Sequence, residues 1–290
     1  MTTHKFGGNW TVEKLSILSD YLNFYVQALK NQPFNLLYID AFAGNGRITT
    51  CDGESQIEGS ARLALRSVLP FDEYIFIEKN SDYARELETV VQSEFPKFEN
   101  RVKIESGDCN EKLASIAKTV NWRTTRAVLF LDPYATAVKY ETLQSIAATK
   151  AVDVWYLFPV MAAQRLMPND VTVYDTYVNW KMKLDDLFGS NSWYERFYKE
   201  SNQLMLFDDD REILKTARED TLKTYIIERL KAVFPNVAPN PRMLYNTNNT
   251  PLFLFCFAVS NPDSKAFGLA LKAANHILKK DWINQNGGAP

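Results

Sequence analysis

Cysteine and histidine are scarce in this chain, which limits the kinds of site that it can build. The 290 residues include three cysteines and two histidines. The cysteines, Cys51, Cys109 and Cys256, are widely spaced, and no Cys-x-x-Cys pair occurs. This number and spacing argue against a structural zinc site or a disulfide framework. We therefore expect reduced thiols and no bound metal.

Long apolar runs and an excess of charge of one sign are also missing. The longest apolar stretches, residues 35–44 and 251–259, are far shorter than the roughly 20 residues that cross a bilayer. The first ten residues are polar, unlike a signal peptide, so we expect a cytoplasmic protein. With a formal net charge of −2, a nucleic-acid partner would need a local basic groove. The candidates for such a groove are Lys5, Lys14, Arg47, Lys79, Lys139 and Arg165.

What the chain does contain is an alternation of short apolar runs with amphipathic segments. Continuous apolar runs between turn residues are typical of strands buried on both faces of a parallel sheet. The predicted strands are 34–39, 73–77, 102–106, 127–131 and 152–158. Helical spacing predicts helices at 16–30, 60–68, 81–95, 110–120 and 140–149. Strands that alternate with helices in this way predict βαβ units with helices on both faces of the sheet.

The pattern changes after Pro159. Residues 161–235 carry aromatic and charged side chains at helical spacing and show no clear strand, so we interpret them as a helical insertion. The acidic run 208–210 is interpreted as a solvated turn or helix start, because consecutive carboxylates point in different directions. Residues 242–246 and 251–260 then predict an antiparallel β-hairpin, followed by a helix at 264–280. We expect residues 1–160 and 236–290 to form one α/β domain.

Ligands of open α/β sheets bind outside the carboxyl ends of the strands. The first predicted strand ends at Asp40 and is followed by a turn with Gly44 and Gly46. Glycines there let the backbone turn sharply and approach a ligand closely. A dinucleotide site would show Gly-x-Gly-x-x-Gly directly after the strand. Asp40 could instead hold a positively charged amine, directly or through water; the alternative is an ordinary strand-to-helix turn.

The second and third strands also end in carboxylates. Glu78, followed by Lys79, could accept hydrogen bonds from both hydroxyls of a ribose, as the acidic residue of dinucleotide folds does. Asp108, between Gly107 and Cys109, could accept from the exocyclic amine of an adenine. Asp is also a favoured helix N-cap, and the two roles exclude each other only in part.

The fourth strand is followed by Asp132, Pro133 and Tyr134. Proline fixes the backbone, the aspartate supplies a hydrogen-bond acceptor, and the tyrosine offers a flat face for stacking. Such a set could hold a planar amine beside a methyl donor, although a turn explains Asp-Pro equally well. In succession, the four strand ends resemble class I S-adenosylmethionine-dependent methyltransferases. The predicted cofactor residues are Asp40, Phe42, Ala43, Gly44, Gly46, Glu78, Lys79, Asp108 and Cys109; the predicted catalytic residues are Asp132, Pro133 and Tyr134.

The chain also resembles the three-Cys-motif partner proteins. The segments that carry this resemblance are 14–30, 38–46 (YIDAFAGNG), 59–61, 76–79, 107–108 and 130–134, together with the late hairpin at 251–252. The resemblance covers most of the chain and is weakest in the insertion. It implies a bacterial or phage protein with a Rossmann-like class I methyltransferase sheet. It further implies a genetic partner with a three-cysteine motif, similar to radical-type iron–sulfur proteins, whose cysteines are not those of this chain.

Residues 132–134 are also similar to the Asp/Asn-Pro-Pro-Tyr motif of enzymes that methylate amino groups in nucleic acids. In that motif the acid holds the target amine and the ring stacks on the base. Here the second proline is missing, so Tyr134 stands one residue closer to Asp132.

Two main hypotheses follow. The chain is a methyltransferase that acts on an amine, for instance an adenine in nucleic acid. Alternatively, it is a cofactor-binding or inactive scaffold module that serves the three-cysteine partner, with the aromatic insertion as docking surface. A metal-dependent hydrolase is disfavoured, because glycines stand where a metal site needs a further carboxylate or histidine.

Overall fold

The structure is a computed structural model that describes residues 9–49, 56–200 and 213–282. Expectations for Lys5, Cys51 and the acidic run 208–210 fall outside these residues. Within them, no helix combines the length and apolarity that membrane crossing needs.

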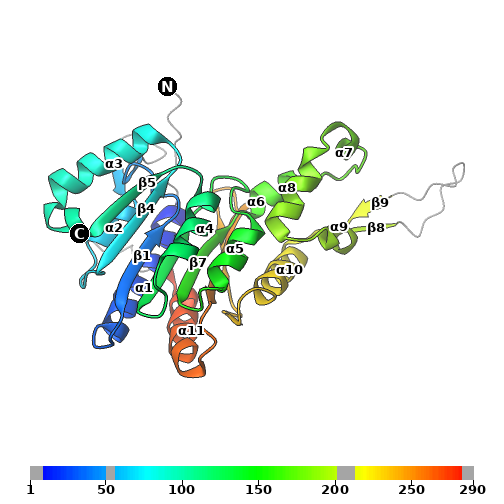
Figure 1. The fold of residues 1–290 in the computed structure, drawn as a ribbon. Helices are drawn as coiled ribbons and strands as arrows, with labels where there is room; N and C mark the ends of the chain where they lie inside the picture. The colour runs from blue at the N-terminus through cyan, green and yellow to red at the C-terminus, as the bar shows by residue number, and fades with distance from the viewer. Residues whose placement is uncertain (1–8, 50–55, 201–212, 283–290) are drawn as a thin grey trace, which may run out of the picture.

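A mostly parallel sheet forms the centre of the molecule (Figure 1). Its parallel strands are β1 (Asn35–Asp40), β4 (Glu73–Glu78), β5 (Val102–Ser106), β6 (Thr125–Leu131) and β7 (Val152–Phe158). The antiparallel additions are β12 (Pro251–Val259) on β7, with β10 (Asn236–Val237) and β11 (Arg242–Tyr245) on β12. The order β5-β4-β1-β6-β7-β12-β10 keeps the first strand central, with the strand order reversing beside it as in Rossmann-like sheets. The predicted fold class, including the antiparallel hairpin, is confirmed.

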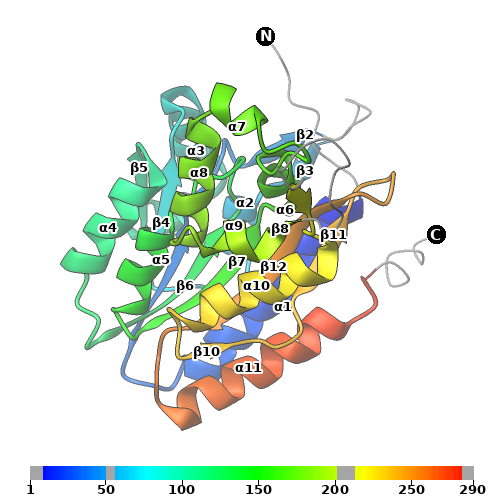
Figure 2. The same ribbon diagram turned by 90° about the vertical axis from the view of Figure 1, so that its right-hand side faces the viewer.

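Helices cover both faces of this sheet. One layer contains α1 (Asn9–Leu29), α2 (Ser60–Leu65), α3 (Ser81–Glu94) and α11 (Ser264–Lys279), with the short 3-10 helix Pro96–Arg101 after α3. The other contains α4 (Cys109–Thr119), α5 (Tyr140–Ala147) and the helices that follow β7. Side chains of a strand alternate between the faces. In β1, Leu36 and Tyr38 pack under α1, whereas Leu37 and Ile39 pack on the opposite face. Figure 2 shows α1 and α11 side by side.

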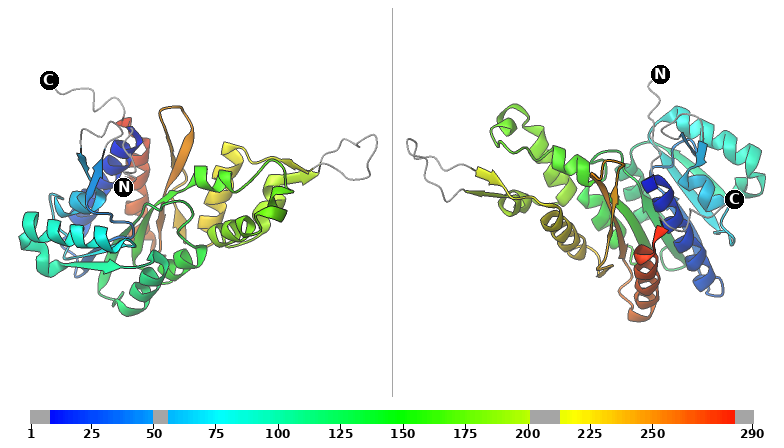
Figure 3. Two further views of the ribbon diagram at one scale, coloured as in Figure 1. Left: turned by 90° about the horizontal axis from the view of Figure 1, so that it is seen from above. Right: turned by 180° about the vertical axis from the view of Figure 1, so that it is seen from behind.

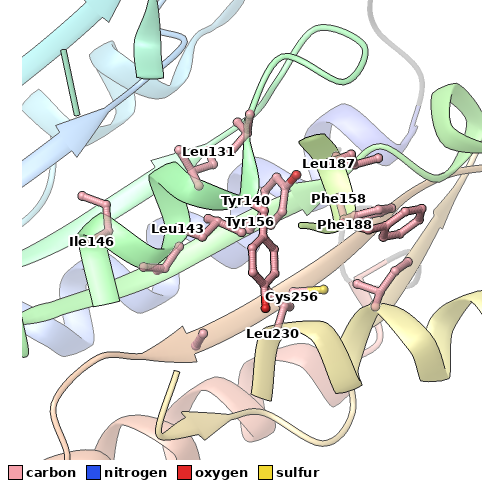
Figure 4. Close-up of a cluster of buried hydrophobic side chains, with 14 of the residues drawn as sticks. Leu131, Tyr140, Leu143, Ile146, Tyr156, Phe158, Leu187, Phe188, Leu230 and Cys256 are labelled. Carbon is pink, nitrogen blue, oxygen red and sulfur yellow. The ribbon is translucent and has the colours of Figure 1, made fainter. Parts of the chain in front are cut away.

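The segment after β7 contains helices and one small hairpin. Its helices are α6 (Val160–Arg165), α7 (Val173–Thr176), α8 (Asn179–Phe188), α9 (Ser192–Phe197) and α10 (Glu219–Lys231). They lie on the far side of the sheet from α1 and α11 (Figure 3). Their apolar side chains join the core of that face: Phe188 stacks on Phe158 of β7 with 5.6 Å between ring centroids (Figure 4). The division into two domains at residues 161 and 235 stays a prediction.

The structure contains short strands that the sequence analysis did not predict. A hairpin of β8 (Tyr198–Glu200) and β9 (Ile213–Lys215) lies within residues 161–235, and β2 (Arg47–Thr49) and β3 (Gln56–Glu58) form another hairpin after β1. Strands of three residues are too short to show alternation in a sequence. Helix α1 also begins at Asn9, seven residues before the predicted start at residue 16.

A buried polar pair lies at the beginning of β7, away from the carboxyl ends of the strands. Tyr21 of α1 donates a hydrogen bond from its hydroxyl to Asp153 Oδ2 at 2.6 Å. Burial raises the pKa of Asp153 from 3.8 to about 7, although Tyr21 and the nearby Arg126 favour the charged form. The folded chain therefore binds a proton at Asp153 that the unfolded chain releases between these pH values. The stability contributed by that proton is present below about pH 4 and is lost as the pH rises through about 7.

We predict that Asp153→Asn is more stable than the original chain at pH 8, by up to about 4 kcal/mol, because the pKa of Asp153 rises from 3.8 to about 7 and each pKa unit corresponds to about 1.4 kcal/mol. Near pH 4 the two proteins should be almost equal, since the amide still accepts from Tyr21. Urea unfolding at both pH values measures the difference. Asp186→Asn, at a side chain that is 57% exposed, is the matched control and should show no such pH dependence. A variant that loses stability more at pH 8 than at pH 4 would contradict this account.

Candidate functional site

The loop that follows β1 crosses the carboxyl edge of the sheet and is tied to the strands on both sides. Ala41 donates its backbone N–H to the carbonyl of Phe130 in β6 at 3.1 Å. Ala43 donates to the carbonyl of Ile77 in β4 at 3.0 Å, and Gly44 donates to Glu78 Oε2 at 2.9 Å. Three hydrogen bonds thus fix the loop between the ends of β4 and β6.

At Gly44 the backbone of this loop has free space beside it. It has a φ of +60°, and a Cβ added there would meet nothing within 4 Å. Gly46 has a φ of +79°, but its Cβ would lie 3.1 Å from Leu87 Cδ1. Phe42 is half-buried and Ala43 is buried. Of the predicted loop residues, Gly44 is therefore the one where a ligand has room to approach the main chain.

Asp40 is completely buried and organises the start of the loop. Its Oδ1 accepts the N–H of Phe42 at 3.1 Å, and the hydroxyl of Tyr38 lies 3.5 Å from Oδ2. Burial raises the pKa of Asp40 to about 7; the side-chain hydrogen bond with Ser60 and the N–H of Phe42 lower it, Asp132 raises it and Lys14 lowers it. With no exposed surface, Asp40 holds the start of the loop, and its role toward an amine stays a prediction.

Glu78 is the last residue of β4, and its carboxylate oxygens can accept further hydrogen bonds. Its Oε2 accepts from Gly44, and its Oε1 accepts the N–H of Asn80 at 2.7 Å. A carboxylate oxygen can accept two hydrogen bonds, so each oxygen retains one position. Lys79 has an 80% exposed side chain, and its Nζ lies 3.3 Å from Asp108 Oδ2.

Asp108 is the N-cap of α4, as the sequence allowed. Its Oδ1 accepts from both the backbone N–H and the side-chain amide of Asn110, each at 2.9 Å. Partial burial opposes ionisation, but the hydrogen bonds from Asn110 and Lys79 hold the pKa of Asp108 below its usual value. Cys109 is buried in the core, and burial raises the pKa of its thiol to about 12. Any contact of Cys109 with a ligand would therefore involve its backbone.

Asn110 is a site residue that the sequence analysis missed. Its Nδ2 donates to the carbonyl of Ala137 at 2.9 Å, and its Oδ1 accepts from the N–H of Lys139 and the hydroxyl of Thr142. Asn110 thus joins Asp108 to the chain that follows residues 132–134. Its partners are 27 to 32 residues away, which no local motif reveals.

Asp132 forms a short-range ion pair with Lys14 of α1. The Lys14 side chain is 7% exposed and that of Asp132 is 22% exposed. The ammonium also lies 4.8 Å from the ring centroid of Trp10. Pro133 is buried, whereas Tyr134 is 72% exposed. The structure therefore brings Asp132 close to Asp40 and Lys14, and places Tyr134 on the surface.

The described members of the suggested basic groove are largely engaged with carboxylates. Lys14 pairs with Asp132, Lys79 with Asp108, and Lys139 with Asp186. Arg47 lies 3.4 Å from Glu94. Arg165, the remaining described candidate, is exposed, and a basic groove beside the strand ends stays a prediction. No group of three or more His, Cys, Asp or Glu residues in the described ranges is arranged to hold a metal ion.

Comparison with known proteins yields likenesses of fold. No protein-family model matches the chain, and no curated protein matches it. Protein LPL1258 from Legionella pneumophila has 11% sequence identity and a TM-score of 0.48, over 94% of this chain and 93% of that one. An O-methyltransferase from Bacillus cereus in complex with SAH has 11% identity and a TM-score of 0.40, over 83% and 80% of the two chains. TomG, an O-methyltransferase from Streptomyces achromogenes in complex with SAM, has 12% identity and a TM-score of 0.40, over 83% and 79%.

At these values the neighbours assign no activity to this chain. The Rossmann-like fold rests on the strand order and directions themselves. The resemblance to the three-Cys-motif partner proteins and the roles of the site residues stay predictions.

The ion pair predicts unequal effects of its two partners on stability. Asp132→Asn should cost about 3 kcal/mol, because it leaves the more buried ammonium without a counter-charge. Lys14→Met should cost about 1–2 kcal/mol, since Asp132 retains some contact with water. Urea unfolding of both variants and of the double variant measures the coupling. Additive losses, or a larger loss for Lys14→Met, would show that the pair does not form as described.

Proposed function

We propose that the chain is an S-adenosylmethionine-dependent methyltransferase whose acceptor is an amine. The observation that supports this most is the order of groups along one sheet edge. Asp108, Glu78, the Gly44 loop and Asp132 follow the ends of β5, β4, β1 and β6, which are successive neighbours in the sheet. Hydrogen bonds between Gly44 and Glu78, and between Gly107 and the Glu78 carbonyl at 3.0 Å, join three of these ends.

The donor set fits an adenosyl cofactor. Both oxygens of Glu78 keep room for ribose hydroxyls, and Gly44 leaves space for close approach to the backbone. Asp108 and the backbone of Cys109 would face the adenine, with Lys79 at the rim and Asp40 holding the start of the loop. Phe42, Ala43 and Gly46 shape the loop. When bound, the cofactor supplies an electrophilic methyl group on a sulfonium.

The acceptor side is formed by Asp132, Pro133 and Tyr134. Asp132 would accept a hydrogen bond from the amine and so orient its lone pair toward the methyl group. Pro133 fixes the backbone, and the exposed ring of Tyr134 would stack on a planar acceptor such as an adenine in nucleic acid. Holding the two reactants in line supplies most of the rate, because a well-oriented pair has a very large effective molarity.

A second candidate function has one observation in its favour. Tyr177, Val178 and Met182, around the start of α8, are between 48% and 65% exposed, as a docking surface for a partner would be. The chain would then be a binding module for a three-cysteine-motif protein. This function needs no methyl transfer and is compatible with cofactor binding.

Calorimetric titration with S-adenosylmethionine and S-adenosylhomocysteine tests the main proposal. We expect micromolar dissociation constants, about −8 kcal/mol. Gly44→Ala should weaken binding at least about tenfold by placing a methyl group in the open space, at a stability cost of about 1–2 kcal/mol for the positive φ. Glu78→Gln should also weaken it about tenfold, since one acceptor oxygen becomes a donor. Gly268→Ala, on α11 and equally free of neighbours within 4 Å, is the control that should bind normally.

If the original chain binds neither S-adenosylmethionine nor S-adenosylhomocysteine, the methyltransferase proposal is wrong. The second candidate function, a binding module for a partner protein, would then remain. Binding that both site variants retain at full strength would place the cofactor elsewhere in the molecule.

A further inference from the structure

The Lys14–Asp132 pair joins residues that are 118 positions apart in the sequence. Lys14 lies near the start of α1, and Asp132 directly follows β6. Lys14 contacts Oδ2 of Asp132, and no described residue donates a hydrogen bond to Oδ1. Because one oxygen is held by a buried ammonium, the direction of the other is fixed. Helix α1 therefore determines how Asp132 faces an acceptor.

The pair also sets the charge of the acceptor side. The negative charge of Asp132 is already balanced by Lys14. A cationic amine would have to leave water for a place where the carboxylate of Asp132 is already paired with Lys14, which is costly. An uncharged amine needs only a hydrogen-bond acceptor, and the second oxygen of Asp132 supplies one.

A second observation on α1 points to a ligand. Thr11 is 1% exposed, and its hydroxyl has no hydrogen-bond partner among the described residues. Residues three apart in a helix share a face, so Thr11 lies on the same face as Lys14, one turn closer to the start of α1. A buried hydroxyl without a partner costs about 1–3 kcal/mol. A ligand that bonds to it would relieve that cost.

We propose that the face of α1 with Thr11 and Lys14 is a wall of the acceptor site, and that the acceptor is an uncharged planar amine with a hydrogen-bond acceptor beside its amino group. Lys14 is a positioning residue: it holds Asp132 and excludes cationic amines. Thr11 donates to the ring atom next to the amino group. This inference rests on the proposed methyltransferase function and names the acceptor class.

The chemistry of the transfer is consistent with this choice. The lone pair of the acceptor nitrogen forms the new N–C bond while the C–S bond breaks and its electrons remain on sulfur. The nitrogen then gives one proton to water. An alkylammonium has no lone pair, so a site that excludes it selects the reactive form.

The test uses two small probes on the full chain saturated with S-adenosylhomocysteine at pH 7.5. 4-Aminopyrimidine represents the uncharged planar amine, and n-butylamine is a cation at this pH. Binding is followed by saturation-transfer NMR titration. We expect the original chain and Lys14→Arg to bind 4-aminopyrimidine at least about tenfold more tightly than butylammonium, a difference of about 1.4 kcal/mol. Lys14→Met should cancel or reverse this preference.

Thr11→Val provides a readout that a purely structural role would not give. Removing an unpaired buried hydroxyl should raise the melting temperature of the chain. The same substitution should weaken the binding of 4-aminopyrimidine about fivefold and leave the affinity for butylammonium unchanged. This variant also keeps the proposal testable if Lys14→Met fails to fold. Lys280→Met is the matched control, because it breaks another ion pair of α1, with Asp20 at 2.6 Å, and should leave the preference unchanged.

The outcomes separate the inference from the function on which it rests. Failure to bind S-adenosylhomocysteine would contradict the proposed function. Normal binding of that compound with no preference between the probes, or with a preference that neither Lys14→Met nor Thr11→Val changes, would overturn the inference alone.

Discussion

Every parallel strand of this sheet must end at the same edge, and the backbone groups of the loops beyond that edge need new partners. In this structure, backbone N–H groups of the loops donate hydrogen bonds to groups at the ends of neighbouring strands. The loop after β1 donates to the carbonyls of Phe130 and Ile77 and to the carboxylate of Glu78, and the turn after β5 donates to the carbonyl of Glu78. The same hydrogen bonds that complete the fold therefore fix the groups that would hold a cofactor. The candidate site and the carboxyl edge of the sheet therefore share one network of hydrogen bonds.

Burial of charge at this edge adds a second constraint. Asp40, Asp132 and Lys14 influence one another electrostatically, and Asp40 and Lys14 are almost entirely removed from water. A buried ion pair seldom adds stability relative to apolar side chains. Under the proposed function this pair would have a role beside the candidate acceptor residues, because it fixes the carboxylate of Asp132 and balances its charge. The unpaired hydroxyl of Thr11 on the same helix face agrees with this explanation.

The sequence predicted what is periodic or local. The five parallel strands, the hairpin and the N-cap role of Asp108 are confirmed, because continuous apolar runs and capping residues act over a few positions. The first turns of α1 were not predicted, because Thr11 and Lys14 are polar residues at buried positions and so interrupt the apolar period. The three-residue strands β2, β3, β8 and β9 were too short to show alternation. The Lys14–Asp132 pair and the contacts of Asn110 arise only when distant segments meet, which no spacing rule reports.

The measurement that tests the central claim most directly is a crystal structure of the protein grown with S-adenosylhomocysteine. The account predicts the adenosyl group across the ends of β1, β4 and β5, with its ribose hydroxyls on Glu78, the sulfur directed toward Asp132, and the Lys14–Asp132 pair intact. S-Adenosylhomocysteine bound away from this edge, or a ribose that makes no contact with Glu78, would contradict it.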